Sequence, residues 1–300
     1  MLSEQLESYE MDYIKSDNVP SMYVDYVNEF LNAKIIEGKS KNTIERYEYY
    51  LNRIFEEINI PIGKLTIYHI RSYFMAEKNR GISDSTLNGY RSILCSFFGW
   101  LQKENLIQNN PVANLGVIKC AKRVREPFSE VEIEKLKSAC TNVRDIAIIM
   151  FMLSTGCRIS EIVELDRDAI NFVSLDCKVH GKGNKERLVY IDTVTAMYLK
   201  RYFATRDDDE KALFVNRSKE RFGVNGIQRM LKTLEKKTGI ENVHPHRFRR
   251  TLATSLINHG MPIQEVAHIL GHEKVDTTMR YIYIESEKVR ASYKRFSYTT

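Results

Sequence analysis

Residues 145–153 read DIAIIMFML, and every side chain from Ile146 onward is apolar. A helix that is apolar on all faces has no face for solvent, so this segment is expected to be a helix buried within a domain. The preceding segment, SEVEIEKLKSAC at 129–140, is amphipathic. Its Ser129 precedes Glu132 by three residues, the spacing of a capping box, which predicts a helix that begins there.

Residues 19–113 are also expected to be helical, in four or five segments without a convincing pair of strands. In SKNTIERYEYYLNRIFEEI, at 40–58, apolar side chains recur at helical spacing, and Asn42 or Thr43 is a plausible N-cap. The residues of this apolar face are Ile44, Tyr47, Leu51, Ile54 and Phe55. The segment SDSTLNGYRSILCSFFGWL, at 83–101, has the same pattern.

The period changes at residues 170–192, where two short β-prone runs flank the loop GKGNKE. Such runs around a glycine-containing loop predict a hairpin. After it the chain is expected to be helical again to its end. The fold class that follows is mainly α with a small antiparallel β-hairpin or sheet.

A chain of 300 residues suggests two domains. Residues 1–18 are expected to be an acidic tail and 19–113 a helical domain. Pro111 and the sequence after it mark a boundary, so 114–126 is expected to be a linker. The second domain is expected to span 127–300.

The net charge of the whole chain is +6, although its first 18 residues carry five carboxylates and one lysine. A basic body with an acidic tail indicates a polyanionic partner, only weakly because many basic proteins bind none. The linker contains Lys119, Lys122, Arg123 and Arg125. These side chains either lie along phosphates or simply face solvent.

The five cysteines are scattered without a CxxC motif, which argues against a zinc site or a disulfide framework and for reduced thiols in or near cores. No apolar run is long enough to span a bilayer, and no signal-peptide pattern opens the chain. A cytoplasmic protein without a membrane association is therefore expected. No P-loop motif or carboxylate metal cage is evident in the sequence.

Residues 244–284 carry the densest group of candidate functional side chains. Pro245 suits the first position of a helix, which places His246 and Arg249 on one face near its N-terminus, a good pocket for a phosphate. The alternative is a surface His and Arg without a task. A second helix is expected to end at Gly271, as in a helix-turn-helix that binds DNA without catalysis. Tyr281 follows it, and Tyr283 lies close by, so spacing alone does not select one tyrosine over the other.

Two further cations lie about 100 residues upstream. Arg158 follows a helix-breaking Gly156 at the start of another helix, where an anion is favoured. Lys182 lies between two glycines in the hairpin loop, where backbone can approach a ligand closely. Each of these residues alone has an ordinary structural explanation.

Taken together, four segments resemble the tyrosine recombinases, the phage integrase family, in their order and intervals. They are STGCRISEIVEL, HGKGNKERLVYI, HPHRFRRTLAT and ILGHEKVDTTMRYIY, of which the second is most similar to the Xer branch. The resemblance implies a helical core-binding domain followed by a catalytic domain. The site residues that it implies are Arg158, Lys182, His246, Arg249, His272 and Tyr281.

The resemblance implies that Tyr281 attacks a DNA phosphodiester and forms a 3′-phosphotyrosyl link. This link retains the energy of the phosphate ester, so no metal, ATP or other cofactor is expected. Phenol titrates near ~10, so cations around the phosphate are needed to favour the phenolate-like attack. Arginines can bind phosphate oxygens bidentately, whereas Lys182 gives up its proton more readily and suits a general acid. His246 would take or give a proton, and His272 would orient the phosphate.

The sequence departs from the family pattern at Arg250, where a second histidine is usual; this arginine would face either the phosphate or the DNA backbone. Phe248 replaces a common leucine and Tyr190 a frequent proline. The final segment, 285–300, looks like a short helix that in the family docks onto a neighbouring protomer. Packing of this segment on its own domain is the alternative.

The implied partners are double-stranded DNA with a specific recombination site and further copies of the chain in a synaptic tetramer. A partner recombinase or an accessory protein is also compatible with the sequence. The alternatives are a topoisomerase-like enzyme with the same chemistry and a non-catalytic helix-turn-helix regulator. A regulator predicts no need for Arg158 or Lys182.

Overall fold

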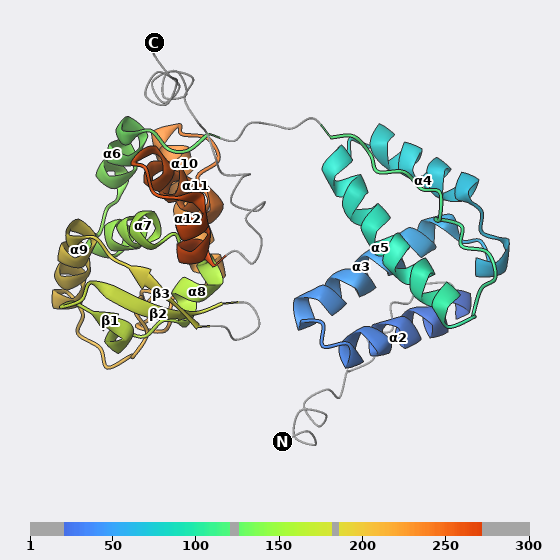
Figure 1. Cartoon of the computed structure of the whole chain (residues 1–300), viewed down its shortest axis with the longest axis horizontal. Coiled ribbons are helices and arrows are strands. Elements are labelled where there is room, and N and C mark those ends of the chain that lie inside the picture. Colours follow the sequence, from blue (N-terminus) through green and yellow to red (C-terminus); the bar gives the residue numbers. More distant parts are fainter. Residues whose placement is uncertain (1–20, 121–125, 182–185, 272–300) are drawn as a thin grey trace, which may run out of the picture. The chain divides into compact units, whose positions relative to one another are not determined.

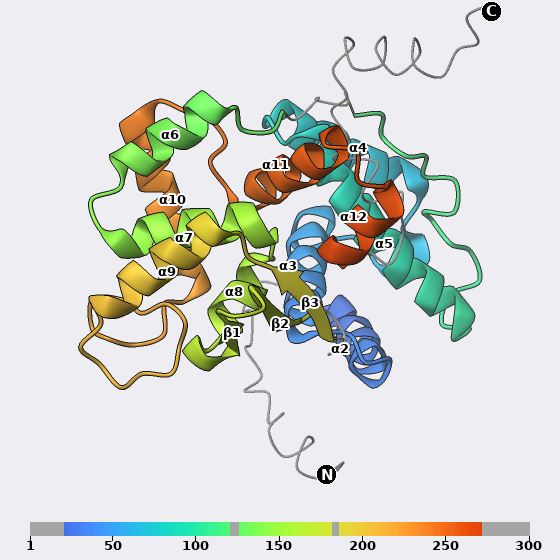
Figure 2. The same ribbon diagram turned by 60° about the vertical axis from the view of Figure 1, so that its left-hand side comes forward.

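The structure is a computed structural model that describes residues 21–120, 126–181 and 186–271. The chain divides into two compact units between Lys122 and Arg123 (Figures 1 and 2). The expected acidic tail at 1–18 and most of the basic part of the linker lie outside the described residues. The bounds predicted for the four segments, 1–18, 19–113, 114–126 and 127–300, therefore stay predictions.

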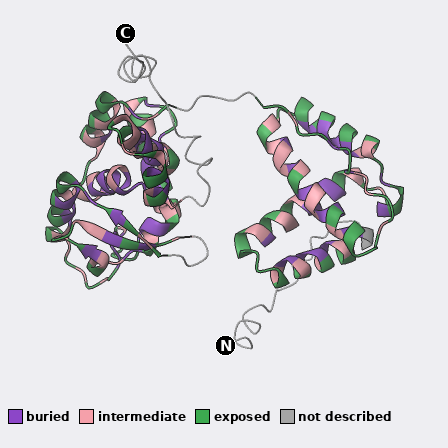
Figure 3. Ribbon diagram, in the orientation of Figure 1, coloured by how far each residue is buried: buried purple, intermediate pink, exposed green. Residues whose placement is uncertain are grey.

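The first unit contains four α-helices in its described part, within the predicted four or five. They are α2 (Ser21–Ile36), α3 (Lys41–Ile58), α4 (Ile67–Asn79) and α5 (Asp84–Lys103), with the short 3-10 helix η1 (Ile62–Lys64) before α4. The helix α5 contacts each of the other three. Their buried faces meet in one core rich in aromatic rings, and the outer faces are exposed (Figure 3).

The start of α3 corrects one prediction. Ser40 is the N-cap, with extended backbone angles of φ −65° and ψ 150°, and its carbonyl accepts from the amides of Thr43 and Ile44. Asn42 and Thr43, the predicted caps, already lie within the helix. The predicted apolar face is confirmed, since four of its five residues are buried and Tyr47 is half-buried.

At the other end of this unit, α5 holds the chain that leaves it. The Asn88 side chain donates to the carbonyl of Ile118 at 2.6 Å and accepts from its amide at 2.9 Å. Arg91 Nε donates to the carbonyl of Leu115 at 2.7 Å. Residues 115–118 are thus attached to α5 by side chains.

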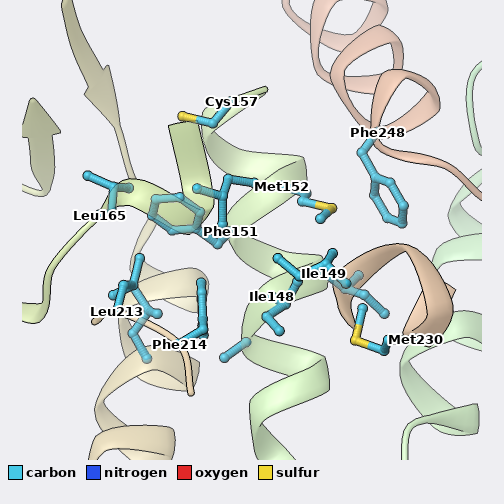
Figure 4. Close-up of a cluster of buried hydrophobic side chains, with 14 of the residues drawn as sticks. Ile148, Ile149, Phe151, Met152, Cys157, Leu165, Leu213, Phe214, Met230 and Phe248 are labelled. Carbon is cyan, nitrogen blue, oxygen red and sulfur yellow. The ribbon is translucent and has the colours of Figure 1, made fainter. Parts of the chain in front are cut away.

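The second unit is built around α7 (Val143–Thr155), the buried helix that the sequence predicts. Residues from Ala147 to Met152 are all buried, and α7 contacts α9, α11 and β3. Figure 4 shows its side chains packed with Leu213, Phe214 and Phe248 from other segments. The helices around it are α6 (Glu130–Ala139), α8 (Ile159–Glu164), α9 (Thr193–Ala204), α10 (Val224–Thr238), α11 (Pro245–Asn258) and α12 (Ile263–Leu270).

The capping box predicted for α6 is present. The Ser129 hydroxyl accepts from the amide of Glu132 at 3.2 Å, and the Glu132 carboxylate accepts from the amide of Ser129 at 2.8 Å. Arg247 from α11 also binds this carboxylate at 2.9 Å.

The predicted hairpin is confirmed as part of an antiparallel sheet with the order β1-β2-β3. Its strands are β1 (Ile170–Asn171), β2 (Asp176–His180) and β3 (Glu186–Tyr190), and a short 3-10 helix, η2 (Arg167–Ala169), precedes β1. In the register, Cys177 pairs with Val189 and Val179 with Arg187. Because strand side chains alternate, Arg187 lies on the same face as the buried Val189.

The expectation that the chain is helical throughout after the hairpin is wrong for residues 205–223. This stretch is largely irregular and forms isolated bridges between Asp166 and Ala212 and between Val215 and Arg221. Its Leu213 and Phe214 are buried against α7 and α9, so packing of the interior holds it without a helix.

All five cysteines are free. Burial raises the pKa of Cys157 to about 11 and that of Cys177 to about 12, so both remain protonated thiols at neutral pH. Among the helices of the described ranges, none combines the length and the apolar character needed to cross a membrane.

Candidate active site

Gly156 sets the position of Arg158. It ends α7 with a left-handed φ of 58°, and its amide still donates to the carbonyl of Met152. A Cβ at this position would lie 2.9 Å from side-chain atoms of both Leu252 and Leu270, so only glycine lets α7 end against α11 and α12. The chain then turns directly into α8, and Arg158 is the N-cap residue of that helix.

Arg249 lies inside the domain. Pro245 occupies the first turn of α11 as predicted, and Arg249 follows one turn later with only 2% of its surface exposed. Its Nη1 donates to the carbonyl of Gly156 at 2.7 Å, and its Nη2 donates to the carbonyl of Leu270. This guanidinium therefore joins the ends of α7 and α12.

Arg158 reaches the same place from the other side. Its Nη2 donates to the carbonyl of Gly271 at 3.2 Å. The two arginines singled out from the sequence thus meet at the C-terminal end of α12. The next residue in the chain is His272, which lies outside the described residues.

Glu161 is a site residue that sequence reasoning missed. It is 3% exposed, and its carboxylate accepts from Arg158 Nη1 at 2.8 Å and from the Arg158 amide at 2.6 Å. Arg187 binds it with both Nη atoms, at 2.6 and 2.7 Å. Burial alone would raise the pKa of Glu161, but these hydrogen bonds outweigh it and hold the pKa below its ordinary value.

Arg187 is the second residue missed, because the more apolar pair in this strand, Leu188 and Tyr190, points to the other, exposed face. The alternation in ERLVY places its side chain on the inward face with Val189. A charged side chain on the buried face of a strand needs a partner, and the glutamate three residues after Arg158 is that partner. Burial lowers the pKa of Arg187, and the bonds to Glu161 more than restore it, so the pair is ionised.

The remaining predicted residues differ in where they lie. His246 is exposed near the start of α11, with its ring 6.4 Å from that of His244. Arg250 is buried, at 6% exposed, and Lys119 is exposed. Outside the described residues lie Lys122, Arg123, Arg125, Lys182, His272, Tyr281 and Tyr283.

The described residues contain no group of three or more His, Cys, Asp or Glu side chains placed to hold a metal ion. What they bring together is a set of guanidinium groups around one buried carboxylate and one helix end. Fixed cations in a partly desolvated place are suited to an anion with several oxygens, such as a phosphodiester.

Residues 127–288 match the phage integrase family, and residues 26–108 match the phage integrase N-terminal SAM-like domain. The chain belongs to the phage integrase family of tyrosine recombinases. The first match contains the whole site and all four motif segments named above.

The tyrosine recombinase XerA of Pyrococcus horikoshii is 31% identical over 90% of this chain and 93% of its own length. A crystal structure of XerA recombinase is 28% identical and covers 92% of this chain and 99% of that one, with a TM-score of 0.54. A lambda integrase dimer bound to a COC′ core site has a TM-score of 0.74 at 15% identity, over 87% of this chain and 95% of that one, and shows the fold alone.

The chain is therefore a Xer-like tyrosine recombinase, an enzyme of site-specific DNA recombination. The helix-turn-helix look-alike at 262–284 lies within the integrase match, so a non-catalytic regulator is not favoured. The convergence of Arg158 and Arg249 agrees with a catalytic role, because it gathers fixed cations at one point of the domain.

Proposed function

We propose that this recombinase breaks and rejoins DNA strands through a 3′-phosphotyrosyl intermediate, with Tyr281 as the nucleophile. The observation that supports it most is the convergence of Arg158 and Arg249, from separate helices, on residues 270–271. His272 follows this point directly in the chain, and Tyr281 nine residues later.

In the proposed cleavage step, the Tyr281 oxygen attacks phosphorus and the bond to the 5′-oxygen breaks. Arg158 and Arg249 bind the non-bridging oxygens and stabilise the charge that grows on them in the transition state. Arg249 suits this role because two backbone carbonyls already hold its guanidinium in place, so little reorganisation is needed when charge develops.

The protons balance through the remaining residues. Lys182 gives a proton to the departing 5′-oxygen, and His246 receives the phenol proton or returns one. His272 orients the phosphate. The phosphate ester is exchanged rather than hydrolysed, so a 5′-hydroxyl of another strand reverses the step without ATP.

The proposed partner is double-stranded DNA with a specific site, on which copies of the chain form a synaptic tetramer. Lys119, Lys122, Arg123 and Arg125 lie along phosphates, and the segment 285–300 docks onto a neighbouring protomer through Val289 and Tyr293. A second recombinase or an accessory protein takes part where a site requires it. The reaction takes place in the cytoplasm.

A nicked suicide duplex tests the nucleophile. A site is first recovered by covalent capture from a pool of nicked duplexes with randomised arms, selected under denaturing conditions. We expect wild type and Tyr283→Phe to form a protein–DNA adduct without ATP, and Tyr281→Phe to form none while it still binds the duplex. An adduct that persists in Tyr281→Phe and disappears in Tyr283→Phe contradicts the assignment.

Arg158→Ala tests the phosphate site on the same duplex. Cleavage is expected to fall far more than binding, because binding is spread over many phosphates while the transition state depends on this cation. Equal losses of binding and cleavage would contradict that role.

A further inference from the structure

Three consecutive carbonyls at the end of α12 each accept a hydrogen bond from a different arginine. Ile269 binds Arg187 Nε at 3.1 Å, Leu270 binds Arg249 Nη2, and Gly271 binds Arg158 Nη2 at 3.2 Å. The last carbonyls of a helix have no partner within it and carry its partial negative charge. The arginines thus cap α12, and two of them are the proposed catalytic cations.

The third cation, Arg187, has no role in the proposed chemistry, yet all three nitrogens of its guanidinium donate hydrogen bonds. Its side chain is 9% exposed, lies under α12 from β3 and holds Glu161 with two short bonds. It also lies against Gly271, since a Cβ there would come within 2.8 Å of Arg187 Cδ. Arg187 therefore touches both the carboxylate beside Arg158 and the helix end that leads to His272.

The contacts of Arg187 with Glu161 affect how strongly this carboxylate binds Arg158. Its carboxylate is shared between Arg158 and Arg187, so its charge is divided between two cations. If Arg187 were neutral, the same buried carboxylate would pair with Arg158 alone. A carboxylate that binds Arg158 fully competes with the phosphate for this guanidinium and repels the phosphate at short range.

We propose that Arg187 is a positioning residue for strand cleavage. It neutralises the charge of Glu161 and fixes the end of α12, so that the guanidinium of Arg158 is available to the scissile phosphate. This inference rests on the proposed function of Arg158. Arg187 itself does not touch the DNA. It acts through Arg158, which binds the phosphate, and through the end of α12, which leads to His272.

The neighbours of Glu161 predict how a variant responds to pH. The groups that face it are Arg158, the N-cap of α8, and Arg187 from β3, with Cys157 close by. Burial raises the pKa of Cys157 to about 11, so this thiol stays neutral from pH 6 to 8.5. Without Arg187 the hydrogen bonds and the charge that it contributes no longer lower the pKa of Glu161, so this pKa rises relative to wild type, and acid should discharge the carboxylate and relieve its competition for Arg158.

The test compares Arg187→Met, which keeps an apolar stem against Gly271, with Arg187→Lys, which keeps a charge but cannot bind bidentately. The double variant Arg187→Met with Glu161→Gln removes the carboxylate charge as well. Arg206→Met is the matched control, because Arg206 forms an equally buried pair with Asp208 and binds the carbonyls of Ala212 and Glu210 elsewhere in the same unit.

Adduct formation on the suicide duplex is measured from pH 6 to 8.5, with DNA affinity and urea unfolding of each variant. We expect Arg187→Met to cleave about 100-fold more slowly than wild type at pH 8, the loss typical of a displaced catalytic group, with affinity changed only a few-fold. The cleavage rate of Arg187→Met, divided by that of wild type at the same pH, should increase toward pH 6. The double variant should recover about tenfold at pH 8, and Arg187→Lys should lie between Arg187→Met and wild type.

Three results overturn the inference. The first is cleavage by Arg187→Met within about threefold of wild type, the second is a loss equal to that of Arg206→Met, and the third is a loss that neither acid nor Glu161→Gln relieves. If Arg187→Met does not fold, the same comparison is made between Arg187→Lys and the double variant that combines Arg187→Lys with Glu161→Gln. If wild type captures no duplex from the pool, the proposed function fails first and the inference fails with it.

Discussion

Gly156→Ala tests whether the end of α7 positions the site. Gly156 and Gly239 both end helices with left-handed backbone, at φ 58° and 71°. A methyl group at 239 meets nothing within 4 Å, whereas one at 156 comes within 2.9 Å of Leu252 and Leu270 and 3.7 Å of Arg249. Gly239→Ala is therefore a matched control for the backbone contribution.

The magnitude follows from two contributions. Left-handed backbone costs an alanine about 1–2 kcal/mol relative to glycine at either position. Overpacking of an interior adds about 1–3 kcal/mol at position 156 alone. We expect Gly239→Ala to lower the free energy of unfolding by the first amount and Gly156→Ala by about 2–5 kcal/mol.

Urea unfolding measures the stability of both variants, and the suicide duplex measures their cleavage. Because the Gly156 carbonyl holds Arg249 at 2.7 Å, cleavage by Gly156→Ala should fall at least about tenfold under conditions where the variant is folded. Gly239→Ala should cleave like wild type. Equal destabilisation by the two substitutions, or normal cleavage by Gly156→Ala, would refute this account of the site.

Two further predictions concern the core and the response to acid. Phe151→Ala should lower the free energy of unfolding by about 3–5 kcal/mol in urea, because the ring is fully buried in α7; a loss below about 1 kcal/mol would contradict the central position of this helix. Burial raises the pKa of Glu132, but its bonds to Ser129 and Arg247 outweigh it and hold the pKa below 4.5. Its contribution to stability is thus present above pH 4.5 and is lost as the pH falls through the lower pKa of the folded state. Glu132→Gln should unfold at a midpoint temperature that falls less steeply on acidification than that of wild type, and parallel curves would contradict this.

Apolar periodicity predicted much of the fold. It placed the buried α7, the apolar face of α3 and the hairpin that became β2 and β3. It erred at a helix boundary and where structure depends on distant packing. The N-cap of α3 is Ser40 rather than Asn42 or Thr43, and residues 205–223 are held by burial of Leu213 and Phe214 rather than by helical hydrogen bonds.

The sequence predicted several residues of the candidate site, but it did not predict how their side chains are buried and bonded. Motif order indicated Arg158 and Arg249, but nothing in the local sequence indicated that Arg249 would be buried. That burial depends on carbonyls of Gly156 and Leu270, which come from two other segments of the chain. Glu161 and Arg187 were missed for the same reason, since a pattern reports which face is apolar and not which polar groups meet there.

The attachment of Arg249 to the end of α7 has a consequence for how the site opens. Helices with fully buried surfaces expose their amides only in openings that approach complete unfolding, whereas exposed segments open at little cost in free energy. Arg249 is bonded to the carbonyl that ends the most buried helix of its unit. Its guanidinium is therefore tied to a segment that opens only at a high cost in free energy, and local fluctuations that expose nearby loops leave this cation in place.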